Sequence, residues 1–203
     1  MREILENNKV CAILRNIPGD YVLDYARAAY RGGIRMFEVA MNTPEGARQI
    51  ELLRNELKAD TCIGAGTVID ERRCREAKAA GAQFFLTPSV SVTTFKFCRF
   101  HDIPLLPGVL TPSDVNICLD YGYTVMKLFP AGEMPRHYIR SLKGPFDNTD
   151  YVAVGGVSLE NYREFLDGGY VGVGIGSNLI PHNYIEERDW EKAAAYIGSF
   201  LKK

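Results

Sequence analysis

Residues 36–65, MFEVAMNTPEGARQIELLRNELKADTCIGA, contain the repeating unit on which the fold prediction rests. An apolar run at 36–40 is followed by an amphipathic stretch that begins near Glu45, and a second apolar run follows at 61–65. Two successive strands joined by a helix of this length lie parallel, because parallel pairing needs a crossover connection. The segment therefore predicts one strand–helix–strand unit of a parallel sheet.

The same alternation continues along the whole chain for eight cycles. The predicted strands are 10–14, 36–40, 61–65, 83–87, 104–106, 124–129, 151–154 and 171–175. The predicted helices begin near Asp20, Glu45, Asp70, Ser91, Pro112, Pro135, Ser158 and Asp189, and a short N-terminal helix spans 2–8. Eight such units predict an α/β fold, a single (β/α)8 TIM barrel whose one domain spans 1–203.

A doubly wound open sheet is the main structural alternative. That fold usually carries a glycine-rich nucleotide turn after its first strand. The closest stretch here is Gly64-Ala-Gly66-Thr-Val-Ile69, in which Ile69 replaces the third glycine of the motif. The sequence therefore favours the barrel, although periodicity alone leaves both folds open.

Composition excludes several classes of protein. The chain has 203 residues, 46% hydrophobic and 24% charged, with a net charge of -1, so we expect neither a nucleic-acid partner nor a membrane partner. Residues 1–9 carry charges of both signs and no apolar run, which predicts a cytoplasmic protein. Five cysteines without a Cys-x-x-Cys pair are typical of reduced thiols.

Lys127 is the only charged residue in Tyr123-Thr-Val-Met-Lys-Leu-Phe-Pro-Ala131. Burial disfavours the ammonium form and so favours a neutral, nucleophilic amine. The alternative is a lysine whose stem packs on the sheet while its head reaches water.

Active sites of such barrels lie at the C-terminal ends of the strands, where several polar residues are predicted. Glu38 is a second charge in an apolar strand and is a candidate proton carrier for Lys127, or its structural ion-pair partner. Arg15 ends the first strand and could bind a substrate carboxylate, or lie on the surface. The other strand-end candidates include Thr67, Pro88 and Phe129.

Glycines follow the last two strands. Gly155-Gly156 comes after the seventh, and Gly174-Ile-Gly176-Ser177 comes after the eighth, where barrel enzymes often bind phosphate between backbone N–H groups and a short helix. Ser177 would add a hydroxyl donor. Tight barrel corners are the alternative explanation for these glycines.

Metal chemistry has weak support in the sequence. The three histidines are His101, His137 and His182, and none lies at a predicted strand end. We therefore predict no metal site, although a magnesium site built from carboxylates alone stays possible.

Taken together, the strand-end motifs resemble the bacterial 2-keto-3-deoxy-6-phosphogluconate (KDPG) and 2-keto-4-hydroxyglutarate (KHG) aldolases, and also the 6-phosphogalactonate aldolases. The resemblance runs in order from Val10 to Leu179. The motifs are Cys11-Ala-Ile-Leu-Arg15, Phe37-Glu-Val-Ala40, Ile63-Gly-Ala-Gly-Thr-Val68, Thr87-Pro-Ser89, Pro107-Gly-Val-Leu-Thr-Pro112, Met126-Lys-Leu-Phe-Pro-Ala131, Val154-Gly-Gly-Val157 and Gly174-Ile-Gly-Ser177.

The resemblance implies a role for each matching residue. Lys127 matches the Schiff-base lysine and Glu38 the general acid/base. Arg15 and Thr67 match positions that hold the pyruvyl carboxylate, and Pro88 lines that pocket. The phosphate loops match Gly155, Gly156, Gly176 and Ser177. The resemblance further implies a homotrimer without metal or organic cofactor.

Two positions depart from the gluconate-type pattern. Asn42 stands where some members carry arginine, so carboxylate binding would rest on Arg15. Val154 stands where gluconate-type members tend to have threonine. The similar 6-phosphogalactonate aldolases have valine at this position, as this chain does. That change removes a hydroxyl near the C4 centre of the substrate and leaves the stereochemical preference open.

The expected function is that of a class I aldolase, an aldehyde-lyase of carbohydrate metabolism. It would cleave a phosphorylated 2-keto-3-deoxy sugar acid to pyruvate and glyceraldehyde 3-phosphate, and possible further substrates include 4-hydroxy-2-oxoglutarate, which yields glyoxylate. Two alternatives share the barrel and the phosphate loops: a metal-dependent sugar phosphate epimerase or isomerase, and a non-catalytic barrel that binds a phosphorylated ligand.

Overall fold

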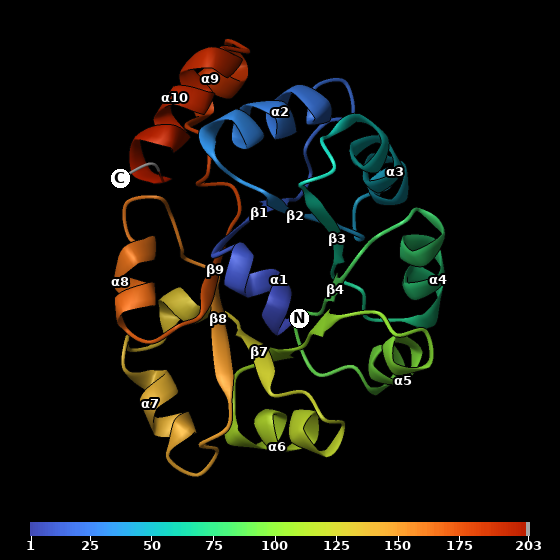
Figure 1. The fold of residues 1–203 in the computed structure, drawn as a ribbon, viewed down its shortest axis with the longest axis vertical. Helices are drawn as coiled ribbons and strands as arrows, with labels where there is room; N and C mark the ends of the chain where they lie inside the picture. Colours follow the sequence, from blue (N-terminus) through green and yellow to red (C-terminus); the bar gives the residue numbers. More distant parts are fainter. Residues whose placement is uncertain (202–203) are drawn as a thin grey trace.

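Parallel strands and helices alternate through residues 1–201, which are the residues that the computed structural model describes (Figure 1). The strands are β1 (Val10–Leu14), β2 (Met36–Ala40), β3 (Cys62–Gly66), β4 (Phe85–Leu86), β5 (Leu105–Leu106), β6 (Gly108–Val109), β7 (Val125–Leu128), β8 (Asp150–Val154) and β9 (Gly172–Ile175). The helices are α1 (Arg2–Asn7), α2 (Val22–Gly32), α3 (Gly46–Glu56), α4 (Glu71–Ala79), α5 (Val92–Phe100), α6 (Pro112–Asp120), α7 (Tyr138–Lys143), α8 (Tyr162–Asp167), α9 (His182–Glu186) and α10 (Trp190–Leu201), with a 3-10 turn η1 (Ala131–Glu133).

The strands form one parallel sheet whose order follows the chain, β5-β4-β3-β2-β1-β9-β8-β7-β6. The first and last strands, β1 and β9, pair with each other in parallel. An open doubly wound sheet would reverse its strand order at a switch point, and no such reversal occurs among the described strands. The open-sheet alternative is therefore wrong, and the predicted TIM barrel is confirmed as a nearly closed parallel barrel.

The two ends of this sheet are consecutive in the chain and are separated only by Pro107. On one side, Leu105 and Leu106 pair with β4. On the other, Gly108 and Val109 pair with β7. Proline has no N–H to donate to a ladder, but the carbonyl of Pro107 accepts the N–H of Lys127 at 2.8 Å. The predicted fifth strand, 104–106, therefore continues past Pro107 to Val109 and joins the two edges of the sheet.

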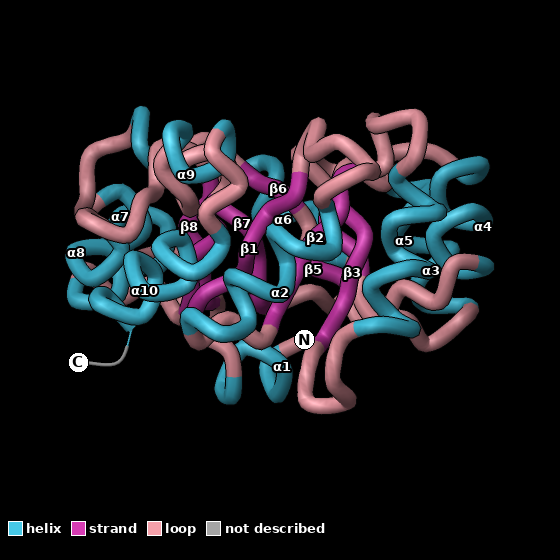
Figure 2. Tube along the Cα trace, turned by 90° about the horizontal axis from the view of Figure 1, so that it is seen from above, coloured by secondary structure: helices cyan, strands magenta, loops and turns pink. Residues whose placement is uncertain are grey.

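The barrel interior has its own apolar core, separate from the larger core between barrel and helices. It includes side chains from most of the strands and Leu5 of α1. A Cβ atom on Gly172, at the start of β9, would lie 3.2 Å from Cδ2 of Leu5. Helix α1 therefore closes the barrel at the N-terminal ends of the strands, and it lies across one end of the barrel in both views (Figures 1 and 2).

Capping side chains hold the starts of α4, α5, α6 and α10. Asp70 caps α4 by accepting the N–H of Arg73 at 2.9 Å, and Thr111 with Asp114 forms a capping box before α6. Helix α2 ends before Gly33, which adopts a left-handed φ of 116°.

The predicted helix start at Ser158 is wrong, because α8 begins at Tyr162. The side chain of Asn161 accepts the N–H of Ser158 at 2.9 Å and donates to the carbonyl of Gly156 at 3.0 Å. These two bonds hold residues 156–161 in a turn that delays the helix.

Two further differences concern short helices. The predicted start near Pro135 is displaced to Tyr138, and α9 is a five-residue helix that the sequence did not predict. None of the helices in residues 1–201 combines the length and apolar character that a membrane crossing requires.

Candidate active site

Lys127 and Glu38 lie on the interior face of the barrel, on β7 and β2. Side chains along a strand alternate between its two faces. Val125 and Met36, two residues earlier on the same strands, belong to the interior core, so Lys127 and Glu38 share that side. Lys127 is 2% exposed and Glu38 is 0% exposed. The lysine head therefore does not reach bulk water as a surface lysine would.

The Glu38 carboxylate is buried without a hydrogen-bond partner. Neither Oε1 nor Oε2 accepts a bond from another described residue. No ion pair joins Glu38 to Lys127 within residues 1–201, although the two charges are near enough to influence each other. A buried polar group without a partner is costly to the fold and is typical of functional sites. The arrangement leaves both groups available to a third molecule.

Burial lowers the pKa of the Lys127 amine below its ordinary value. The nearby Glu38 carboxylate acts in the opposite direction, whereas the Arg15 guanidinium lowers the pKa further. The Nζ atom lies 5.0 Å from the centroid of the Phe129 ring. A larger fraction of Lys127 is therefore neutral at a given pH than of a solvated lysine, which is what nucleophilic attack requires.

Arg15 and Thr67 lie together at the C-terminal ends of β1 and β3. The Nη2 atom of Arg15 donates to Oγ1 of Thr67 at 3.4 Å. Thr67 has a left-handed φ of 57°, an uncommon conformation for a residue with a branched β-carbon. A guanidinium and a hydroxyl at one place suit a carboxylate ligand.

A pocket of about 340 Å³ opens at the same end of the barrel. It brings together seven of the predicted site residues, namely Arg15, Phe129, Val154, Gly155, Gly156, Gly176 and Ser177. Arg15 is the only charged residue in its lining. The pocket therefore favours an anionic ligand, and it is adjacent to Lys127 through the Phe129 ring.

The glycine loops leave backbone donors free beside this pocket. Within residues 1–201, the N–H groups of Gly156, Ser177 and Asn178 donate to no protein acceptor. Free N–H groups gathered in loops bind phosphate oxygens well. Among the described residues no helix follows β9 directly, because a turn follows Gly176 and α9 begins only at His182.

Gly155 and Gly156 are glycines for two structural reasons as well. Both have positive φ, 89° and 71°. In addition, η1 packs directly on them: the N–H of Gly132 donates to the carbonyl of Gly155 at 2.8 Å, and a Cβ on Gly156 would lie 2.9 Å from the Cα of Gly132. The tight-corner explanation and the phosphate explanation therefore apply to the same loop.

Five positions considered from the sequence are absent from the lining of this pocket, namely Lys127, Glu38, Thr67, Pro88 and Asn42; the first two are buried on the interior face of the barrel, and Thr67 is bonded to the lining residue Arg15. The backbone of Pro88 packs instead on Gly108 at the start of β6. Asn42 lines a different pocket, of about 530 Å³, with Arg72 and Arg73.

The pocket also contains residues that the sequence analysis did not select. These are Ile13, Asn16, Val157, Gly174 and Asn178. Ile13, Val157 and Gly174 lie within the strand-end motifs, and Asn16 and Asn178 each follow the last residue of one, so taking the whole motifs and one further residue would have found them.

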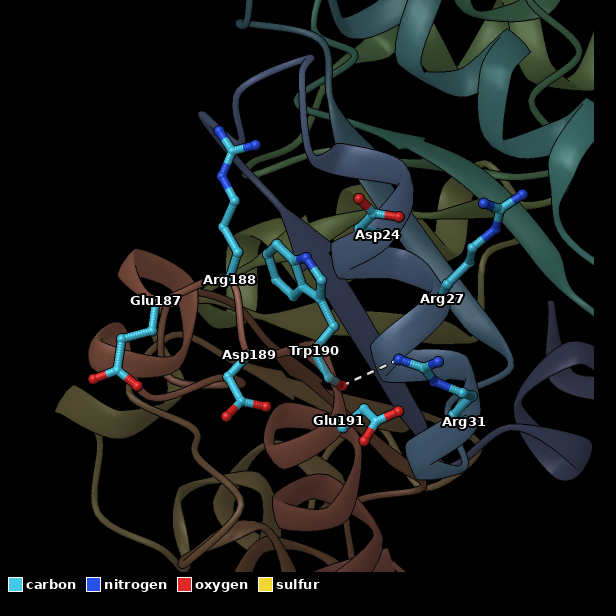
Figure 3. A pocket seen from close by; sticks show the side chains of 8 residues that line it. All are labelled: Asp24, Arg27, Arg31, Glu187, Arg188, Asp189, Trp190 and Glu191. Atoms are coloured by element: carbon cyan, nitrogen blue, oxygen red, sulfur yellow. Dashed lines mark hydrogen bonds between the residues drawn. The ribbon is translucent and has the colours of Figure 1, made fainter.

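A larger pocket, of about 690 Å³, lies between α2 and residues 187–191 (Figure 3). Its lining is Asp24, Arg27, Arg31, Glu187, Arg188, Asp189, Trp190 and Glu191. Arg31 donates to the carbonyl of Trp190 at 3.2 Å (Figure 3). Its charges are of both signs and none of its residues belongs to a strand, so it lacks the features of a barrel active site.

Comparisons with known proteins agree with the family resemblance of the sequence motifs. The family model of the KDPG and KHG aldolases matches residues 1–196. The 2-dehydro-3-deoxy-phosphogluconate aldolase of Dickeya dadantii is 33% identical over 177 residues, which are 87% of this chain and 83% of that protein. The 2-dehydro-3-deoxy-6-phosphogalactonate aldolase of Escherichia coli is 29% identical over 190 residues, 93% of each chain.

A solved structure gives the same result at the level of the fold. It is the KDPG aldolase of Legionella pneumophila, with pyruvate captured at low pH as a covalent carbinolamine intermediate. The two chains superpose with a TM-score of 0.88 at 29% identity, and the match covers 98% of this chain and 97% of that one.

Proposed function

This chain belongs to the KDPG and KHG aldolase family and is a class I, pyruvate-dependent aldolase, and we propose that it cleaves a 2-keto-3-deoxy-6-phospho sugar acid through an imine on Lys127. The products are pyruvate and glyceraldehyde 3-phosphate. One observation carries the proposal: an amine with a lowered pKa and a carboxylate without a partner are buried together inside the barrel.

The reaction begins when the neutral amine of Lys127 attacks the C2 ketone. Glu38 supplies a proton to the carbinolamine hydroxyl, which leaves as water, and the protonated imine remains. Glu38, directly or through water, then takes the proton of the C4 hydroxyl. The C3–C4 electron pair moves into the imine, which releases the aldehyde and leaves an enamine of pyruvate.

The second half of the reaction returns the enzyme to its starting state. Protonation of the enamine at C3 regenerates an imine, now of pyruvate. Water adds to this imine and the amine of Lys127 leaves, so pyruvate is released and one water molecule is consumed for the one produced. Glu38 is the group buried beside Lys127 that can carry each of these protons.

Binding at two ends positions the bond that breaks. Arg15 and Thr67 hold the carboxylate next to C2, since they provide a guanidinium and a hydroxyl at the barrel mouth. The loops at Gly155–Gly156 and Gly176–Ser177 hold the distal phosphate with free N–H groups. Fixing both ends lowers the entropic part of the barrier. No described group of three or more His, Cys, Asp and Glu side chains is arranged to hold a metal ion.

The gluconate-type and galactonate-type substrates differ in configuration at C4, and Val154 is the residue on which we base the choice between them. Val154 is 4% exposed and lines the pocket with Ile13, so this wall is apolar. A galactonate-type substrate is therefore proposed over a gluconate-type one, with 4-hydroxy-2-oxoglutarate as a further, smaller substrate that leaves the phosphate loops empty.

We also propose that the enzyme is cytoplasmic and a homotrimer. Sedimentation analysis would test the homotrimer by measuring the mass of three chains.

The test measures pyruvate release, coupled to lactate dehydrogenase, from the gluconate phosphate, the galactonate phosphate and 4-hydroxy-2-oxoglutarate. Wild-type protein and Lys96→Met should cleave at least one phosphorylated substrate, and a chelator should not slow them; Lys96 is an exposed lysine on α5. Lys127→Met should lose activity by on the order of 1,000-fold or more. Chelator-sensitive turnover, or turnover retained in Lys127→Met, would reject the imine mechanism.

A further inference from the structure

Gly66, the last residue of β3, leaves open the space next to the Glu38 carboxylate. A Cβ atom on Gly66 would lie 1.5 Å from Oε1 of Glu38, 2.3 Å from its Cδ and 2.7 Å from its Cγ. These are the three heavy atoms nearest to that position. A side chain of any kind at position 66 would therefore displace this carboxylate.

The backbone does not explain why position 66 is glycine. Gly66 is absent from the described glycines with positive φ. It lies in regular strand: its Cα pairs with that of Ala40, and its carbonyl accepts the N–H of Met41 at 2.8 Å. Glycine weakens a strand interior and often marks a place where another group approaches closely. Here the approaching group is the side chain of Glu38.

We propose that Gly66 is a positioning residue for Glu38. Its missing side chain lets the carboxylate extend over the end of β3, the strand whose next residue is Thr67. The inference rests on the proposed function, in which Glu38 carries protons to and from the substrate. Proton transfer needs the carboxylate within hydrogen-bond reach of the reacting atom, so a displacement of about 1 Å is enough to slow it.

Gly64 provides a matched control on the same face of the same strand. A Cβ on Gly64 would lie 2.4 Å from both Cε2 and Cζ of Phe84, a ring that is 0% exposed in the barrel core. Alanine at position 64 therefore collides with a packed ring, and the fold loses stability. Alanine at position 66 collides instead with the Glu38 side chain from Oε1 to Cγ, which can rotate about its own bonds, so we expect a smaller loss of stability than at position 64.

The experiment measures two quantities in each variant. One is the exchange of pyruvate methyl protons with deuterium from solvent, followed by NMR, because this exchange requires the imine and a group that moves protons. The other is the thermal unfolding midpoint. Gly66→Ala should slow exchange by about 10- to 1,000-fold with a small change in midpoint. Gly64→Ala should lower the midpoint more and slow exchange less at a temperature where it is folded.

A shortened carboxylate gives a second, independent readout. Glu38→Asp withdraws the carboxylate from the space beside position 66. In the Glu38→Asp background, Gly66→Ala should therefore slow exchange much less than it does in the wild type, and a double-mutant cycle measures this coupling. If Gly66→Ala slowed exchange equally in the two backgrounds, the added alanine methyl group would act through something other than Glu38.

Three results separate this inference from the proposed function. Exchange at the wild-type rate in Gly66→Ala, with an active wild type, would overturn the positioning role alone. A midpoint loss in Gly66→Ala as large as that in Gly64→Ala would overturn it too, because the glycine would then serve the fold. A wild type that binds pyruvate and neither exchanges its methyl protons nor forms an adduct would instead reject the proposed function.

Discussion

Arg15 and Thr67, which are 52 residues apart in the chain, meet at the barrel mouth with Nη2 of the arginine 3.4 Å from Oγ1 of the threonine. The same guanidinium also lowers the pKa of Lys127, together with burial, which has the larger effect. In the proposed reaction this one residue would therefore have two effects that can be measured separately: it would bind the substrate carboxylate, and it favours the neutral form of the nearby amine.

Arg15→Met should change the pH dependence of pyruvate adduct formation at saturating pyruvate. The amine reacts when neutral, so the rate rises as pH rises through the pKa of Lys127. Arg15 lowers that pKa, and its removal should raise it, which moves the rising limb to higher pH. The KM for pyruvate should also increase by about tenfold, because a charge-assisted bond is lost. Arg48→Met, on the exposed face of α3, is the control and should alter neither quantity. A rising limb that moves to lower pH in Arg15→Met would contradict the electrostatic argument.

Val154→Thr should change which diastereomer is cleaved. A hydroxyl at this wall of the pocket can bond the C4 oxygen in one configuration, and a neutral bond of this kind is worth about three- to tenfold in rate. The ratio of kcat/KM for the gluconate and galactonate phosphates should move toward gluconate. Val157→Thr, which adds a hydroxyl to the loop beside the same pocket, is the control. An unchanged ratio in Val154→Thr would refute the role of this position.

Ser177→Ala should weaken binding of phosphorylated substrates selectively. Ser177 lines the pocket next to the free N–H groups that are assigned to phosphate. The KM for the phosphorylated sugar acid should rise by about three- to thirtyfold, since one bond to a charged group is lost. The KM for 4-hydroxy-2-oxoglutarate should stay the same. In the control Ser199→Ala, on α10, the KM values for both substrates should be unchanged. Equal effects on both substrates would place the phosphate elsewhere.

The barrel could be predicted from sequence because each strand is a short apolar run between amphipathic stretches. Val10–Leu14 and Met36–Ala40 were predicted to the residue. The fifth strand was not, since proline usually ends a strand pattern, and only the structure places Gly108 and Val109 beside β7. Helix α9 has five residues, too few to show helical periodicity.

The candidate site was predicted less completely. Lys127 and Glu38 are visible in the sequence because a charge within an apolar strand is unusual, and the barrel rule places strand ends together. The relationship between Gly66 and Glu38 was not visible, since it depends on how a side chain leans across a neighbouring strand. For the same reason, the sequence predicted no difference between Pro88, outside the pocket, and Val154, inside it.

Borohydride reduction in the presence of pyruvate tests the imine on Lys127 most directly. The protein is incubated with pyruvate, reduced, digested and mapped by mass spectrometry. We predict one reduced pyruvyl adduct, on Lys127, in the wild type and in Lys96→Met, and none in Lys127→Met. An adduct on another lysine, or no adduct under conditions in which pyruvate binds, would contradict the account.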